Sequence, residues 1–104
     1  MKTIKLMPDY ECFPLWHCDE EKVGDIDPAS IGISQELVRK LSDWQSDYDA
    51  TLDRLNGENS GFPSKEKEIA FVVKGYELAK ELKCELINVN VVYFDIDQLR
   101  ERSV

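Results

Sequence analysis

The chain has 104 residues, 42% of them hydrophobic, and a formal net charge of −8 at pH 7. This length and composition predict a single domain over residues 1–104 that folds without a metal or disulfide. Such an acidic protein repels nucleic acids and anionic lipids and attracts basic proteins. We therefore expect neither a nucleic acid nor a membrane among its partners.

The negative charge is concentrated in the N-terminal half. Residues 9–27 hold seven acids and one lysine, a net charge of −6, whereas residues 64–104 contribute only −1. The basic and apolar start of the chain is too short for a signal peptide, and the three cysteines are an odd number. These features predict reduced thiols and a cytoplasmic protein.

Two short strands are predicted at the start of the chain. Residues 3–7 alternate between polar and apolar side chains, as a half-buried strand does. Residues 14–18 read as a second strand, paired with the first in a hairpin. Residues 19–27 follow as a charged loop that contains a glycine.

The most regular pattern predicts a helix over residues 34–56. Ser34 is a good N-cap, and Asn56-Gly57 is a typical helix end. Large apolar side chains recur along one face at steps of three and four residues. They are Leu37, Leu41, Trp44, Tyr48, Leu52 and Leu55.

A second helix and a third strand are predicted in the C-terminal half. Ser64 caps the helix, and apolar residues from Ile69 to Leu82 cover an arc wide enough to contact two neighbours. Residues 87–94 form the strongest strand pattern in the chain. Residues 95–104 read as a polar tail, with room for one helical turn.

These elements predict an α+β fold with the order β-β-α-α-β. Two long antiparallel helices are expected to pack on one face of a small three-stranded sheet. If the strands alternate in direction, the third runs parallel to the first and lies beside it, which gives the strand order 2-1-3.

Several groups resemble catalytic or metal-binding motifs but lack the required context. Cys12 and Cys18 have C-x5-C spacing, which does not match structural zinc sites, and His17 has no accompanying oxyanion hole. Asp95-Ile96-Asp97 looks like the strand-end motif of phosphoryl-transfer hydrolases, but too little chain follows it to supply the remaining ligands. Asp25-Ile26-Asp27 is an equally short match. We predict no catalytic residue, no metal site and no cofactor.

Four carboxylates lie on the predicted polar side of the long helix. Like charges four residues apart destabilise a helix by about 0.2–0.5 kcal/mol per pair. One interpretation is a solvated face that lysines of the second helix partly neutralise. The other is an acidic docking face, continuous with residues 9–27. The four are Asp43, Asp47, Asp49 and Asp53.

The segments Pro14-Leu15-Trp16 and Tyr48-Asp49-Ala50-Thr51-Leu52, followed by Ser60-Gly61-Phe62, resemble a family of small acidic bacterial proteins. The resemblance covers residues 1 to about 94 and implies a bacterial cytosolic origin and no established catalytic residue. Some proteins of this kind resemble the immunity proteins of toxin systems.

The sequence thus predicts a protein-binding module, not an enzyme. The leading hypothesis is an intracellular immunity protein that inhibits a basic bacterial toxin, such as a nuclease, by direct binding. The alternatives are a housekeeping or scaffold interaction domain and a small Cys/His metal-binding protein. The predicted partner-binding residues are acids with aromatic neighbours. They are Asp9, Tyr10, Glu11, Trp16, Asp19, Glu20, Glu21, Asp43, Asp47, Asp49 and Asp53.

Overall fold

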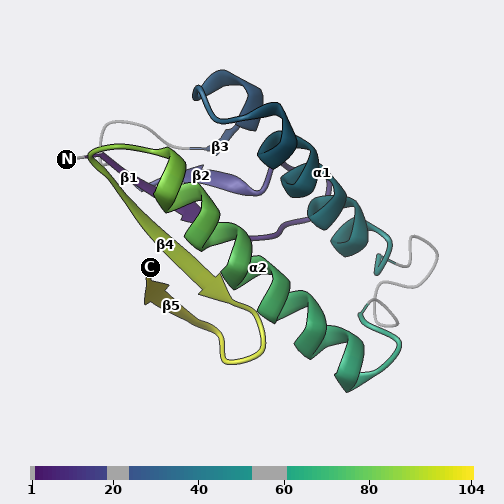
Figure 1. The fold of residues 1–104 in the computed structure, drawn as a ribbon. Helices are drawn as coiled ribbons and strands as arrows, with labels where there is room; N and C mark the ends of the chain where they lie inside the picture. Colours follow the sequence, from purple (N-terminus) through teal and green to yellow (C-terminus); the bar gives the residue numbers. More distant parts are fainter. Residues whose placement is uncertain (1, 19–23, 53–60) are drawn as a thin grey trace.

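A computed structural model describes residues 2–18, 24–52 and 61–104 of the chain. Within these residues, five strands and two α-helices form an α+β fold (Figure 1). The elements in chain order are β1 (Lys2–Leu6), β2 (Leu15–His17), β3 (Asp25–Ile26), the 3-10 helix η1 (Pro28–Ser30), α1 (Gln35–Asp49), α2 (Lys65–Glu85), β4 (Val89–Asp95) and β5 (Arg100–Ser103).

The strands form one mixed sheet with the order β3-β2-β1-β4-β5. β1 pairs with β2 in antiparallel fashion, as predicted for a hairpin. On its other side β1 pairs with β4 in parallel, and Ile4 lies opposite Val91. This arrangement confirms the prediction that the strand after the helices lies beside the first strand and runs in the same direction.

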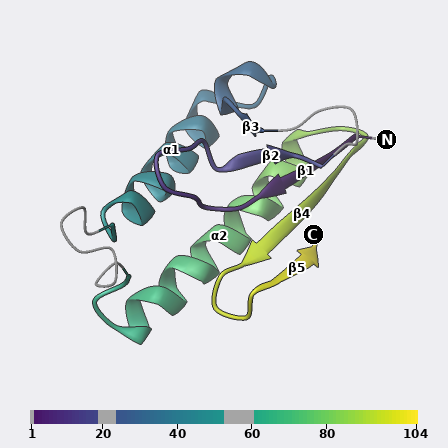
Figure 2. The same cartoon turned by 180° about the vertical axis from the view of Figure 1, so that it is seen from behind.

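Both helices lie on the same side of the sheet, and they run in opposite directions. The helices lie in front of the strands in Figure 1 and behind them in Figure 2. α2 contacts both α1 and β4, which confirms the two neighbours predicted from its wide apolar arc.

The core forms where the inward-facing side chains of the sheet meet both helices. Alternation along the strands directs every second residue inward, and the 3.6-residue helical period brings the apolar seam of α1 down onto them. Trp44 stacks on Phe71 with ring centroids 4.4 Å apart. The buried hydrophobic residues are Ile4, Leu6, Leu15, Ile26, Leu37, Leu41, Trp44, Phe71, Leu78, Ala79, Leu82, Val91 and Tyr93.

The prediction of a three-stranded sheet was wrong, because the chain forms two further edge strands. β3 pairs with β2, where the sequence indicated only a charged loop. β5 pairs with β4, where a polar tail or helical turn was expected. Asp95 makes this last turn: its Oδ1 accepts hydrogen bonds from the backbone N–H groups of Asp97 and Gln98, at 2.9 and 3.1 Å. A side chain that satisfies nearby backbone donors in this way stabilises a reversal of the chain.

The predicted end of the first helix was also wrong. α1 stops at Asp49, and Leu52 is already outside it. The Thr51 hydroxyl donates to the carbonyl of Tyr48 at 2.7 Å, and the backbone N–H of Thr51 donates to the same oxygen at 3.0 Å. These local bonds replace the next helical ones. The expected stop at Asn56-Gly57 lies outside the described residues, as does Leu55.

The predicted helix starts are confirmed. Ser34 caps α1 through a hydrogen bond from Leu37 N–H, and Ser64 caps α2 through one from Lys67 N–H, both at 3.2 Å. Glu85, the last residue of α2, also accepts hydrogen bonds from the N–H and hydroxyl of Ser34. The start of one helix is therefore tied to the end of the other. In the described part of the chain, neither helix is long and apolar enough to cross a membrane.

Candidate functional site

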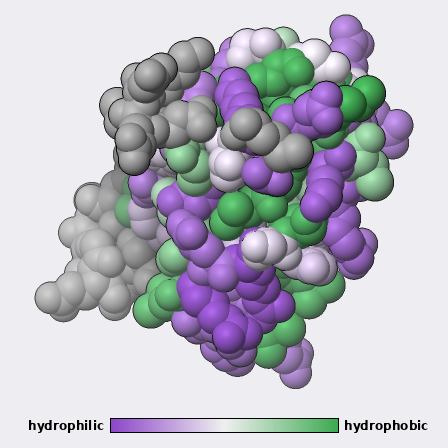
Figure 3. Space-filling model, turned by 90° about the vertical axis from the view of Figure 1, so that its left-hand side faces the viewer, coloured by the Kyte–Doolittle hydropathy of each residue, from purple (hydrophilic) through white to green (hydrophobic). Residues whose placement is uncertain are grey.

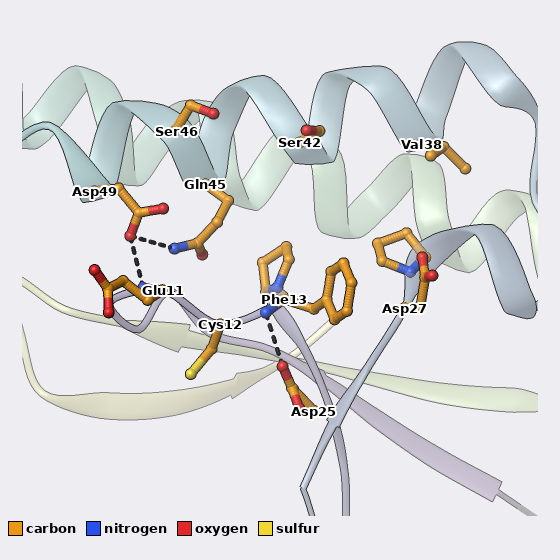
Figure 4. Close-up of a pocket in the computed structure, with 12 residues that line it drawn as sticks. Glu11, Cys12, Phe13, Asp25, Asp27, Val38, Ser42, Gln45, Ser46 and Asp49 are labelled. Carbon is orange, nitrogen blue, oxygen red and sulfur yellow. Dashed lines mark hydrogen bonds between the residues drawn. The ribbon is translucent and has the colours of Figure 1, made fainter.

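A groove of about 490 Å³ lies between α1, the loop before β2 and the segment around β3 and η1 (Figure 4). The loop before β2 forms one wall, α1 forms the opposite wall, and the segment around β3 and η1 closes one end. Three stretches that are distant in sequence therefore meet here. The lining residues are Glu11, Cys12, Phe13, Pro14, Asp25, Asp27, Pro28, Val38, Ser42, Gln45, Ser46 and Asp49.

Asp49 joins the first loop to the end of α1. Its Oδ1 accepts a hydrogen bond from the backbone N–H of Glu11 at 2.8 Å and another from Gln45 Nε2 at 3.0 Å. Glu11 has a left-handed backbone with φ of 60°, and this conformation turns its N–H toward the helix. Gln45 Nε2 also donates to the carbonyl of Asp9 at 2.6 Å. These bonds hold the loop against α1.

Two more carboxylates face the groove from the segment around β3. Asp25 Oδ2 accepts a hydrogen bond from the backbone N–H of Phe13 at 2.9 Å. Asp27 caps η1, and its Oδ1 accepts one from Ala29 N–H at 2.9 Å. Each carboxylate is thus positioned by a backbone donor. The three-residue match Asp25-Ile26-Asp27 therefore has a structural explanation in strand pairing and capping.

The thiol of Cys12 lies in this groove, and its pKa is raised. Partial burial raises the pKa of Cys12 first, and the charges of Asp9, Asp25, Asp49 and Glu11 raise it further. A nucleophilic cysteine needs the opposite environment, in which positive groups stabilise the thiolate. The surroundings of Cys12 therefore keep the thiol protonated.

The structure brings several of the predicted partner-binding residues to this region. Glu11 and Asp49 line the groove, and Asp9 lies directly beside it on the same loop. Asp43 and Asp47 are exposed on α1 but are not among the groove-lining residues. Asp49 does not share their solvated face, as the helical pattern had suggested, because its carboxylate is half-buried against the loop. Asp19, Glu20, Glu21 and Asp53 lie outside the described residues.

The two predicted aromatic anchors are both engaged within the protein. Tyr10 stacks on Tyr48 with ring centroids 4.6 Å apart, and its hydroxyl lies 2.9 Å from Thr51 Oγ1. Trp16 lies in β2, and its indole Nε1 donates to the carbonyl of Met7 at 2.9 Å. Both side chains are half-buried. Their first role is therefore to fix the loop that carries Asp9 and Glu11.

Sequence reasoning missed four groove residues that matter to its chemistry. Phe13 is 47% exposed, and its ring projects toward α1 (Figure 4). Gln45 is buried beneath the loop. The helical pattern does not predict that this polar residue is buried. Asp25 and Asp27 belong to the acidic stretch 9–27, so the charge count was a signal for them. No local pattern pairs them with α1.

Other candidate chemistry finds no support in the described residues. No group of three or more His, Cys, Asp and Glu side chains in this part of the chain is placed to hold a metal ion. The cysteines are unpaired thiols. Asp95, which resembled a phosphoryl-transfer motif, is 2% exposed and forms an ion pair with Arg102 at 2.9 Å. It supports the β4–β5 turn.

Hydrophobic side chains are also exposed outside the groove. On the face shown in Figure 3, hydrophobic residues form small areas separated by hydrophilic ones. Five large hydrophobic side chains are exposed in the described residues, and two of them, Ile69 and Val73, lie one turn apart on α2: Phe13, Ile69, Val73, Ile87 and Leu99.

Comparison with protein families identifies the relatives of this chain. The family described as Serratia CdiI immunity protein-like matches residues 2–96. The chain belongs to this family. This match confirms the resemblance to immunity proteins that the sequence suggested. It spans every residue of the groove and ends before β5 begins at Arg100. No curated protein matches the chain.

Proposed function

We propose that this member of the Serratia CdiI immunity protein-like family is an intracellular immunity protein that inhibits a toxin by binding it directly. Family membership supports the class of function. The single structural observation that supports the binding site is the groove, where carboxylates from three separate segments converge on α1. We propose no catalytic step for the chain, so inhibition rests on the complex alone.

The charge of the molecule defines the kind of toxin that would bind best. The net charge is −8, and no lysine or arginine is among the described residues that line the groove. A basic toxin surface would be attracted over long distances and held in register by complementary charge. Nucleases carry such surfaces because they bind phosphates. Covering this surface would exclude the nucleic acid and so inhibit the enzyme.

The proposed docking residues, which are those predicted from the sequence together with Asp25, divide into groups that can be tested separately. The proposed centre is the groove and its flanking loop, with Asp9, Glu11, Asp25 and Asp49. Asp43 and Asp47 would contribute at the rim, where charges act mainly on the association rate. Tyr10 and Trp16 would act through the loop that they hold. Asp19, Glu20, Glu21 and Asp53 remain proposed contributors, selected on charge alone.

The first experiment asks whether the chain neutralises a toxin. The toxin is the C-terminal region of the protein encoded directly upstream, and it is produced in a host cell with or without this chain. We expect growth only when both are present, and a stable complex in size-exclusion chromatography and calorimetry. Absence of both growth rescue and binding would refute the proposed function and favour an unrelated interaction partner.

The second experiment locates the binding surface. The double variant Asp25→Asn/Asp49→Asn keeps one acceptor oxygen at each position and removes two charges from the groove. We expect its affinity for the toxin to fall by about ten-fold or more, as truncating buried charge pairs at interfaces does. The control Glu66→Gln/Glu77→Gln removes two charges from exposed positions on α2. Equal losses in both variants would show that the groove is not the binding site.

A further inference from the structure

The floor of the groove contains a buried amide whose orientation is determined by its neighbours. Gln45 is 7% exposed, and its Nε2 donates to two oxygens, the Asp9 carbonyl and Asp49 Oδ1. Both partners are acceptors only, so the NH₂ group must face them. A flipped amide would place oxygen against oxygen. The position of Gln45 Oε1 is therefore determined as well.

This oxygen is an acceptor without a donor. Gln45 Oε1 is buried and has no hydrogen-bond partner among the residues that the structure describes. Buried polar atoms are nearly always paired, and an unpaired one costs free energy. Gln45 is a groove-lining residue, and its side chain descends from α1 toward the loop (Figure 4). A ligand that donates a hydrogen bond here would remove that cost.

The surroundings of this oxygen select a cation. The carboxylates of Asp25, Asp27 and Asp49 line the same groove. The upward shift of the Cys12 pKa, caused by burial and then by neighbouring acids, reflects the same negative charge. An anion would be repelled, and an apolar group would leave Gln45 Oε1 unpaired. The complementary ligand carries positive charge and several donors.

A guanidinium group meets these conditions better than an ammonium group. It is planar, it has five N–H donors and no acceptor, and it is more weakly hydrated. It can therefore donate to Gln45 Oε1 and to a neighbouring carboxylate at once. Its flat face can also stack on an aromatic ring, and Phe13 presents an exposed ring at this position. The volume of about 490 Å³ leaves space for the flanking atoms of a polypeptide.

We propose that this groove receives an arginine side chain of the toxin, with Gln45 Oε1 and Asp49 as the acceptors and Phe13 as the stacking surface. This inference rests on the proposed function, since it names the toxin group that the immunity protein recognises. It makes Gln45 and Phe13 recognition residues, although neither is acidic.

The first test uses small probes and the isolated chain. Backbone amide resonances are followed by NMR during titration with N-acetyl-arginine methylamide, its lysine analogue and its citrulline analogue. Citrulline has nearly the same shape as arginine but no charge and fewer donors. We expect saturable shifts at Glu11, Phe13, Gln45 and Asp49 with the arginine probe, and several-fold weaker binding of lysine. Equal shifts with arginine and citrulline would overturn the proposal.

Variants of the chain connect the probe to the named residues. Asp49→Asn keeps an oxygen that can accept the bonds from Glu11 and Gln45, so the fold should survive. We expect Asp49→Asn to weaken binding of the arginine probe by about five-fold or more. The control Glu66→Gln on α2 should change the affinity for this probe by less than about two-fold. Gln45→Met removes the unpaired oxygen. If that variant does not fold, Phe13→Leu tests the stacking surface, and unchanged arginine binding would count against the proposal.

The second test uses the toxin and separates the two proposals. Each arginine of the toxin is replaced by lysine, and its affinity is measured against the wild-type chain and Asp49→Asn. We expect one arginine whose replacement weakens binding to the wild type by about ten-fold but has little further effect on Asp49→Asn. Tight toxin binding without such an arginine would overturn this inference and leave the proposed function intact. A toxin that does not bind the wild type would remove both.

Discussion

Gly75 occupies the closest approach between α2 and the rest of the core. A Cβ atom at this position would lie 2.5 Å from Trp44 Cζ2 and 2.5 Å from the Tyr93 hydroxyl oxygen. Neither side chain can move easily, because both are fully buried and Tyr93 donates to the carbonyl of Val72 at 2.8 Å. The absence of a side chain at Gly75 is therefore required by packing.

Gly75→Ala should destabilise the protein despite the better helix propensity of alanine. Alanine would stabilise a helix by about 0.8–1 kcal/mol, but overpacking a core costs about 1–3 kcal/mol. We expect a net loss of about 1 kcal/mol, measured by urea unfolding. Lys74→Ala, at the exposed neighbouring position, should change stability by less than about 0.5 kcal/mol. A Gly75→Ala protein more stable than the wild type would contradict the packing described here.

The environment of Cys12 predicts that its thiol is alkylated slowly. Burial and four nearby acids raise its pKa, so less thiolate is present at a given pH, and the rate of alkylation should be low and rise with pH. Cys18 and Cys84 are exposed and serve as internal references. At pH 8, mass spectrometry after timed iodoacetamide treatment should show Cys12 modified several-fold more slowly than either. Faster labelling of Cys12 would indicate a positive environment and argue against the acidic groove.

At the scale of single residues, the sequence predicted the acids of the candidate site better than the tertiary contacts of their neighbours. Asp9, Glu11 and Asp49 were selected by charge, and the structure does bring them together. Tyr10 was taken as an exposed anchor because it stands among acids, yet it stacks on Tyr48 from α1. This contact joins residues 38 positions apart, so no local sequence pattern predicts it. The role of Gln45 depends on the same fold-back of the loop.

The two helix starts differ in one contact, and this difference is measurable. Ser34 caps α1 and also donates to Glu85 from its N–H at 2.6 Å and its hydroxyl at 2.8 Å. Ser64 caps α2 by the same type of bond. We expect Ser64→Ala to cost about 0.5–1 kcal/mol of stability and Ser34→Ala about 1–2 kcal/mol, since it also loses its hydroxyl bond to Glu85. Equal losses in urea unfolding would show that the contact with Glu85 contributes nothing.

The carboxylate of Asp95 connects the β4–β5 turn to the last strand. Asp95 accepts hydrogen bonds from Asp97 N–H and Gln98 N–H, and it forms an ion pair with the Arg102 guanidinium. Asp95→Asn would place an amide donor against Arg102, and hydrogen bonds to charged groups contribute about 1.5–3 kcal/mol. We expect a stability loss in that range and faster hydrogen exchange in β5.

Glu101→Gln provides the control on the same strand. Glu101 pairs with Lys5 at 3.4 Å on an exposed surface, and such pairs contribute about 0–1 kcal/mol. Slow exchange of the β5 amide protons in Asp95→Asn would show that strand pairing alone holds this edge.

The elements that the sequence predicted well are those with strong local periodicity. The caps and seams of both helices and the parallel pairing of β1 with β4 followed from residue patterns. β5 could not be predicted in this way, because Arg-Glu-Arg-Ser has no apolar alternation and its pairing with β4 follows the turn that Asp95 stabilises. The end of α1 also depends on tertiary contacts, since Thr51 is held between Tyr48 and Tyr10.

For the whole molecule, the proposed complex should form at a rate that depends on charge. With a net charge of −8, association with a basic toxin should be accelerated by long-range attraction. The Debye length shortens to about 3 Å at 1 M salt, so this attraction is screened. We expect the association rate constant to fall by about ten-fold or more between 0.02 and 0.5 M NaCl, with a smaller change in dissociation. Surface plasmon resonance with the toxin domain measures both rates, and a salt-independent association rate would contradict electrostatic steering.

Composition predicted that the N-terminal half would be the acidic one, but not which acids would share a surface. Asp25 and Asp27 meet Asp49 only because β3 joins the sheet edge and η1 then leads the chain to α1. That geometry comes from pairing between short strands, whose sequence signal is weak. The sequence therefore predicted an acidic region, and the three-dimensional structure was needed to identify the groove within it.

The parallel pairing of β1 with β4 also determines when the sheet can form during translation. Residues 2–6 leave the ribosome early, yet their neighbours in the sheet are residues 89–95. At about 5–20 residues per second, several seconds of translation separate the two. During that interval β1 exposes one unpaired edge, and the aromatic cluster of Trp44 and Phe71 lacks Tyr93. A chain that stops before β4 would therefore lack both the parallel neighbour of β1 and the Tyr93 ring beside Trp44.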